Sequence, residues 1–180
     1  MEHFYQTVEG WSQGIDKLYL HVMKTADDGM HFVEVGSWKG RSASFMAVEI
    51  INSEKQIQFD CVDTWKGSEE NQKDKDVIEN TLFEVFTENM KPVNGHYKAI
   101  RLPSINAAEL YDDESLDFVF IDAAHDYENV KKDILAWYPK VKKGGLLCGH
   151  DYPSLQVQEA VHEVLDNVEQ FNKNCWLVKK

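Results

Sequence analysis

The chain has 180 residues, of which 43% are hydrophobic and 12% aromatic, and its formal net charge is −12. This composition is typical of a folded domain and excludes a disordered chain. The acidic charge argues against a nucleic-acid partner, because phosphate backbones attract basic surfaces. We therefore expect a single domain over residues 1–180 that has no nucleic-acid partner.

The cysteines and the N-terminus indicate the compartment. Cys61, Cys148 and Cys175 lie far apart in the sequence and form no C-x-x-C pair, which predicts buried thiols rather than disulfides or a zinc site. No basic segment followed by an apolar run marks a signal peptide, and no apolar run approaches the roughly 18 residues of a membrane span. We expect a cytoplasmic protein with no membrane partner.

The N-terminal part is predicted to be helical. Residues 4–23 place apolar side chains largely at helical spacing, interrupted by Gly10 and Gly14. One broken helix or two short ones should therefore form within an N-terminal helical cap over residues 1–29. The cap is expected to cover a sheet; lining a substrate pocket or making a dimer contact are the alternatives.

Residues 31–35 form a short apolar run that predicts a buried strand, and a glycine turn follows at residues 36–40. Residues 42–51 then carry apolar side chains around most of a helical surface, which is typical of a helix buried against a sheet. With this order of strand, turn and helix, α/β proteins hold ligands at the carboxyl edge of the sheet. Glu34 lies inside the strand, where a carboxylate needs a basic group, backbone donors or a ligand as its partner.

The rest of the chain alternates strands with helices. Strands are predicted at residues 56–62, 97–102, 116–121, 146–148 and 175–178, and helices at residues 77–90, 105–110, 127–137 and after Pro153. Residues 64–76 are polar and charged around one aromatic side chain, and they predict a loop or a mobile lid. The alternation predicts an α/β fold with a mostly parallel sheet of six or seven strands and helices on both faces.

Acidic side chains and histidines cluster where predicted strands end. Because the carboxyl ends of parallel strands converge on one crevice, these side chains should lie close together. Helix capping or a solvated turn would explain any one of them, but not the whole set. The set comprises Glu34, Asp63, Asp122, His125, His150 and Asp151.

The glycine turn argues against two common ligands. Trp38 places an indole where the dinucleotide motif G-x-G-x-x-G needs bare backbone, so a nucleotide-dependent oxidoreductase is disfavoured. Residues 40–42 lack the lysine of a phosphate-binding loop. Glu34 before the turn and Asp63 at the end of the next strand suit a ligand with an amino group and a ribose. S-adenosylmethionine has both groups.

Residues 34–42 resemble the E-x-G-x-x-x-G-x-S motif of the class I S-adenosylmethionine-dependent methyltransferases. Residues 63–67, 121–127 and 144–152 are similar to small-molecule O-methyltransferases related to macrocin O-methyltransferase and to cephalosporin-hydroxylase-type proteins. The likeness to catechol O-methyltransferases is more distant. The resemblance implies a Rossmann-like fold and O-methylation of a small hydroxylated molecule, such as a sugar or a polyketide.

The resemblance also implies roles for individual residues. The first turn would contact the methionine part of the cofactor, the acid ending the second strand would bind the ribose, and the helix after the third strand would approach the adenine. His125 takes the place of the lysine base of the catechol enzymes, and its ordinary pKa near neutrality suits a base. The implied cofactor residues are Glu34, Gly36, Ser37, Gly40, Ser42, Asp63, Thr64, Ser104 and Asp122.

A hydroxyl nucleophile needs a base or a metal to become anionic. Asp122 and Asp151 would hold Mg²⁺ or another divalent metal, with His150 as a further ligand that suits transition metals better than Mg²⁺. The catalytic residues are then His125, His150 and Asp122, and the metal ligands are Asp122, Asp151 and His150. Alternatively, His150 bonds a backbone group at the strand end and no metal is needed.

Two further expectations concern the surroundings of this site. The N-terminal cap, the loop at residues 64–76 and the short C-terminal tail would shape the substrate pocket, leaving an open site that the partner subunit of a homodimer could complete. The alternative to an enzyme is an accessory protein that binds S-adenosylmethionine without catalysis.

Overall fold

The computed structural model describes residues 1–180 and contains one sheet of seven strands in the order β3-β2-β1-β4-β5-β7-β6. The first five strands in the sequence run parallel, and β7 pairs antiparallel with both β5 and β6. The sheet is therefore mostly parallel, as predicted. The strands are β1 (His31–Val35), β2 (Gln58–Asp63), β3 (Lys98–Arg101), β4 (Leu116–Ile121), β5 (Val141–Gly149), β6 (Glu169–Gln170) and β7 (Trp176–Lys179).

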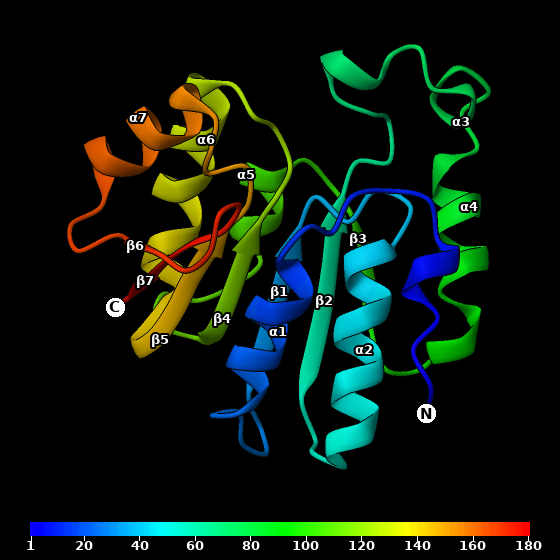
Figure 1. Cartoon of the computed structure of the whole chain (residues 1–180), viewed down its shortest axis with the longest axis horizontal. Coiled ribbons are helices and arrows are strands. Elements are labelled where there is room, and N and C mark those ends of the chain that lie inside the picture. Colours follow the sequence, from blue (N-terminus) through cyan, green and yellow to red (C-terminus); the bar gives the residue numbers. More distant parts are fainter.

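Helices cover both faces of this sheet. Figure 1 shows α1, α2 and α4 on one side and α5, α6 and α7 on the other. No helix is both long enough and apolar enough to pass through a bilayer. The helices are α1 (Ile15–Met23), α2 (Arg41–Ser53), α3 (Lys75–Ile78), α4 (Leu82–Asn89), α5 (Ser104–Ala108), α6 (Tyr127–Trp137) and α7 (Leu155–Val164), with 3-10 turns η1 (Tyr5–Thr7), η2 (Glu69–Asn71), η3 (Lys91–Val93) and η4 (Tyr138–Lys140).

Strand β1 shows how the sheet separates two hydrophobic cores. Neighbouring side chains of a strand point to opposite faces. Phe32 therefore packs into the core under α1 and α2, whereas Val33 and Val35 pack into the core under α5, α6 and α7. Glu34 shares the face of Phe32, where the Tyr19 hydroxyl donates a hydrogen bond to its carboxylate.

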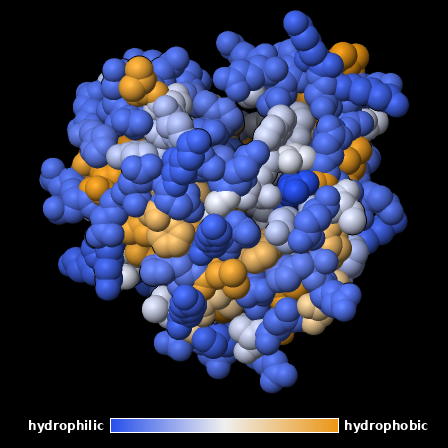
Figure 2. Space-filling model, in the orientation of Figure 1, coloured by the Kyte–Doolittle hydropathy of each residue, from blue (hydrophilic) through white to orange (hydrophobic).

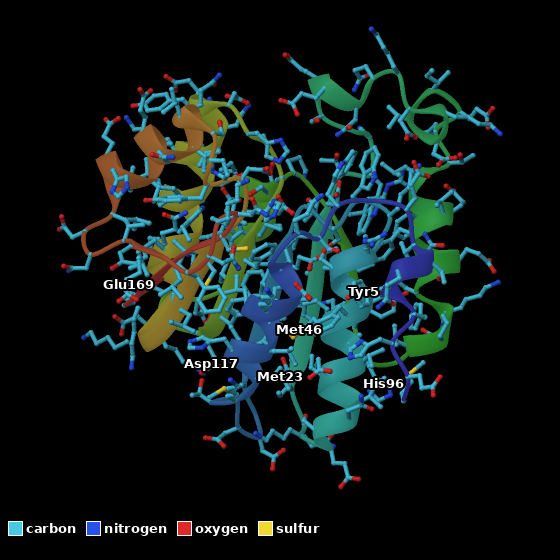
Figure 3. All side chains as sticks on the ribbon, in the orientation of Figure 1. Tyr5, Met23, Met46, His96, Asp117 and Glu169 are labelled. Atoms are coloured by element: carbon cyan, nitrogen blue, oxygen red, sulfur yellow. The ribbon has the colours of Figure 1, made fainter.

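The order of the strands places a crevice between β1 and β4. These two strands are neighbours although β2 and β3 come between them in the sequence, so the direction of the strand order reverses there. Ligands of open α/β sheets bind outside the carboxyl ends of the strands at such a switch point. Figure 3 marks Asp117 at the opposite, amino end of β4, where its carboxylate accepts the His31 backbone N–H at 2.9 Å.

Of three predicted elements, one agrees with the structure and two differ from it in detail. Residues 4–23 form η1 and α1, which is the predicted pair of short elements, with Gly10 and Gly14 at positive φ between them. The helix predicted at residues 77–90 is two helices, α3 and α4, because Asn80 adopts a left-handed backbone with φ of 55°. Strand β5 begins earlier than predicted, at Val141, and its register against β4 shifts next to Gly144, whose φ is 84°.

Candidate active site

A cavity of about 570 Å³ opens at the carboxyl ends of β1, β2 and β4, at the switch point of the sheet. Figure 2 shows a recess at the top of the view, between residues 64–76 (hereafter the lid) and the α6–α7 side. The N-terminal segment at residues 8–14 (hereafter the strap) also contributes to the lining. A cavity of this size is typical of a site for a small molecule or a cofactor.

Asp63, at the end of β2, holds the glycine turn in place. Its carboxylate accepts the backbone N–H groups of Trp38 and Trp65, each at 2.8 Å, and the Trp65 indole N–H donates to the Trp38 carbonyl at 2.8 Å. These bonds stabilise the left-handed backbone of both tryptophans, which is unfavourable for bulky residues. Burial raises the pKa of Asp63, and the bonds from Trp65 and Trp38 partly offset this rise. Each carboxylate oxygen has a further lone pair for a ligand.

Most of the predicted cofactor residues line the cavity. Ser104 lies at its far wall, where its hydroxyl accepts the Trp137 indole N–H at 2.9 Å. Gly40 does not line the cavity; it precedes α2 with φ of 90°, and a Cβ there would lie 3.1 Å from Met90 and Phe86. The predicted cofactor residues that line the cavity are Gly36, Ser37, Ser42, Asp63, Thr64, Ser104 and Asp122.

Glu34 is fully buried beneath the turn and does not line the cavity. The Tyr19 hydroxyl donates to its Oε2 at 2.5 Å, whereas its Oε1 has no hydrogen-bond partner. Burial raises the pKa of Glu34 to about 7. The Ser37 hydroxyl is also buried and has no hydrogen-bond partner, although Ser37 is among the residues that line the cavity. Glu34 therefore lies beneath the wall of the cavity rather than in it.

Asp122, His125 and Asp151 form a compact cluster at the ends of β4 and β5. The Nε2 of His125 lies 3.0 Å from Asp151 Oδ2 and 3.6 Å from Asp122 Oδ1, and one ligand atom from each residue lies within 4.8 Å of the others. Hydrogen bonding to Asp122 and Asp151 raises the pKa of His125 to about 11. Burial alone would raise the pKa of Asp151, but bonds to the histidines hold it well below its usual range. These oxygen and nitrogen donors suit a divalent metal.

His150 lies beside the same two aspartates and also contacts the strap; its Nδ1 is 3.7 Å from Asp122 Oδ1. Its Nε2 lies 3.1 Å from the Gln13 carbonyl of the strap, and its Nδ1 lies 3.2 Å from Asp151 Oδ2. Burial would lower the pKa of His150, but the bond to Asp151 and the charge of Asp122 raise it to about 9. Both ring nitrogens therefore face acceptors, and the ring links the strap to the end of β5. This geometry matches the alternative of a backbone-bonded histidine, although the carbonyl belongs to the strap.

Lys39 is a residue whose role the sequence did not indicate. Its Nζ lies 2.7 Å from Asp76 Oδ2, 3.0 Å from Glu9 Oε2 and 3.1 Å from Asp74 Oδ2. Burial would lower the pKa of Lys39, but the hydrogen bonds with Asp76, Glu9 and Asp74 raise it well above its usual value. Lys39 thus attaches the strap and the lid to the glycine turn. Two features of the sequence could have indicated this role: the lysine lies between two glycines of the turn, and the lid has an excess of acidic residues.

The fold and the position of the cavity are those of the class I S-adenosylmethionine-dependent methyltransferases. The chain belongs to the methyltransferase-domain family, whose model matches residues 33–152. It is 27% identical over 165 residues to the uncharacterized protein R132 of Acanthamoeba polyphaga mimivirus. The aligned region covers 84% of this chain and 69% of that protein. The resemblance to class I methyltransferases is thereby confirmed, whereas the nearer likeness to macrocin O-methyltransferase stays a prediction.

Solved structures of several methyltransferases share the fold. The O-methyltransferase NovP superposes with a TM-score of 0.70 at 16% identity, covering 93% of this chain and 78% of NovP. CalS11, a TDP-rhamnose 3'-O-methyltransferase, gives 0.62 at 14% identity, covering 93% and 77%. An rRNA methylase from Streptococcus thermophilus gives 0.59 at 13% identity, covering 89% and 91%. The fold therefore does not choose between a small molecule and RNA as the methyl acceptor.

Proposed function

We propose that this protein transfers a methyl group from S-adenosylmethionine to a hydroxyl of a small molecule, assisted by a divalent metal. The observation that carries this proposal is the cluster of Asp122, His125 and Asp151 beside the glycine turn, inside one cavity. The likeness in fold to NovP and CalS11, both O-methyltransferases, supports an oxygen acceptor.

The residues of the glycine turn fit the cofactor. Asp63 has lone pairs for the ribose hydroxyls, Ser37 and Ser42 belong to the wall where the methionine part would lie, and Ser104 lies where the adenine would approach. Bound S-adenosylmethionine supplies a methyl group that is already electrophilic. The main contribution of the chain is to hold the acceptor oxygen in line behind that methyl group, since positioning alone can lower a barrier by several kcal/mol.

The cluster of Asp122, His125 and Asp151 fits a metal ion through two carboxylates and one imidazole. A bound divalent metal lowers the pKa of a hydroxyl that coordinates it. The two carboxylates contribute the negative charge that holds a cation, and the imidazole adds a donor that transition metals prefer over Mg²⁺. His150, bonded on both sides, keeps the strap beside the cluster.

A small acceptor is favoured over RNA by charge. The chain has a net charge of −12, and four carboxylates line the cavity, on Asp63, Glu70, Asp122 and Asp151. An RNA backbone would be repelled from such a surface. Filter binding at low salt tests this point, and tight retention of RNA would contradict it.

Calorimetry with S-adenosylmethionine and S-adenosylhomocysteine tests the proposal first. We expect binding at tens of micromolar or tighter, and no binding would overturn the proposal. Methyl transfer to a panel of hydroxylated small molecules follows, with and without EDTA. His125→Ala should remove transfer while the cofactor still binds; if transfer persists in EDTA, the metal has no role. Cofactor binding without transfer to any acceptor would indicate an accessory protein.

A further inference from the structure

The lid places a carboxylate on the outer nitrogen of His125. Glu70 lies in η2 and lines the cavity, and its Oε2 lies 3.2 Å from His125 Nδ1, 55 residues away in the sequence. The other ring nitrogen, Nε2, faces Asp151 and Asp122 at 3.0 and 3.6 Å. The imidazole is thus held between one lid carboxylate and the two carboxylates at the strand ends.

This arrangement assigns different tasks to the two ring nitrogens. Two ligand atoms of one metal, each about 2.1 Å from it at a right angle, lie about 3 Å apart. The distances from Nε2 to the two aspartate oxygens are near that separation. A histidine that binds a metal through one nitrogen usually donates the other N–H to a carboxylate or carbonyl, which fixes the tautomer and the ring orientation. Glu70 occupies the place of that acceptor.

The lid is held at its other end as well. Asp74 and Asp76 bond the buried Lys39 of the glycine turn, whereas Glu70 is 66% exposed and forms its ion pair with His125. A single exposed ion pair contributes little to stability. The contact between Glu70 and His125 therefore contributes more to stability when another interaction already fixes the orientation of the imidazole ring.

We propose that Glu70 is a positioning residue that orients His125 for metal binding, so that metal binding and closure of the lid support each other. The inference rests on the proposed function, because it uses the same metal cluster. By linkage, the factor by which the closed lid strengthens metal binding equals the factor by which the metal favours the closed lid. The site would then be complete only with the lid closed.

Cobalt(II) titration of the full chain, followed by calorimetry and by visible absorption, tests the inference. Glu70→Ala should weaken Co²⁺ binding about tenfold or more and alter the absorption spectrum, because the imidazole loses its orienting acceptor. Glu70→Gln should keep most of the affinity, since its amide oxygen still accepts the Nδ1–H. Glu69→Ala is the matched control, as the neighbouring acid makes no contact with the cluster, and it should bind like the original chain.

Hydrogen exchange gives a second readout that does not depend on activity. Co²⁺ should slow amide exchange at residues 67–72 in the original chain and in Glu69→Ala, but not in Glu70→Ala. Equal Co²⁺ affinity and equal exchange in Glu70→Ala would overturn the inference, as would equal losses in Glu70→Gln and Glu70→Ala. Failure of the original chain to bind Co²⁺ would also overturn it, whereas cofactor binding measured on the same samples decides the methyltransferase proposal separately.

Discussion

Replacing Lys39 by methionine should destabilise the protein, because three carboxylates would lose the cation that they share. The lysine side chain is only 3% exposed, and its Nζ lies within 3.1 Å of Glu9, Asp74 and Asp76. Methionine keeps most of the apolar stem and removes the charge. The carboxylates would then repel one another beneath the lid.

The size of the effect follows from the exposure of the partners. Removing one partner of a buried ion pair costs about 3–5 kcal/mol, because a charge is left buried and unpaired. Glu9 is 75% exposed and counts little, since solvent screens its pair. Asp74 and Asp76 are mostly buried. We therefore expect the low end, about 3 kcal/mol, which lowers the melting temperature of a chain of this size by roughly 6–12 °C.

Thermal unfolding followed by circular dichroism measures this change. The matched control is Lys75→Met, whose lysine is 79% exposed and lies 3.9 Å from Glu79, and which should shift the melting temperature by less than about 2 °C. Adding Asp76→Asn to Lys39→Met should recover part of the loss, because it removes one unpaired carboxylate. If Lys39→Met melts no lower than Lys75→Met, the shared-cation reasoning is refuted.

Three further predictions concern the cavity and the buried strand beneath it. Gly36→Ala should destabilise the fold by about 3 kcal/mol or more and weaken cofactor binding in calorimetry, because its Cβ would lie 2.1 Å from the Asp122 carbonyl oxygen. Folding raises the pKa of Glu34 from 4.5 to about 7, so the folded state favours the neutral carboxyl group. The contribution of this group to the stability of the fold is therefore complete below pH 4.5 and is lost as the pH rises through 7. Glu34→Gln should therefore flatten the fall in melting temperature between about pH 5 and 8, a loss of up to about 3 kcal/mol in the original chain. Trp11→Ala should keep the free energy of unfolding within about 0.5 kcal/mol, since the indole is exposed, but should raise KM for the acceptor because the indole forms part of the cavity rim.

The strands around the cavity could be predicted because their signals are local. Residues 31–35 and 116–121 are apolar runs, and the parallel arrangement follows from their alternation with helices. The convergence of Asp63 and Asp122 on one cavity then follows from general rules for open sheets. The division of α3 from α4 was not predictable in this way, because the left-handed backbone of Asn80 interrupts an otherwise continuous amphipathic pattern.

The roles of the two histidines could not be separated by sequence. His125 and His150 both follow strands that end at the cavity, so their positions in the chain are equivalent. Their environments differ through contacts that are distant in sequence: the strap carbonyl of Gln13 bonds His150, and the lid carboxylate of Glu70 bonds His125. The three partners of Lys39 likewise depend on the paths of the strap and the lid, which no local pattern specifies.

The two acidic residues beside the glycine turn support it in different ways. Glu34 lies beneath the turn without reaching the cavity and accepts the Tyr19 hydroxyl, whereas Asp63 accepts one backbone N–H from the turn, that of Trp38, and one from the lid, that of Trp65. The turn is also joined to its neighbours: Gly36 N–H donates to the Val62 carbonyl, and Asp122 N–H donates to the Val35 carbonyl, each at 2.8 Å. The segments that would hold the cofactor and the metal are thus fixed to each other by backbone contacts. Because the rate of methyl transfer depends on how the methyl group is aligned with its acceptor, we expect these backbone bonds to contribute to the catalytic geometry.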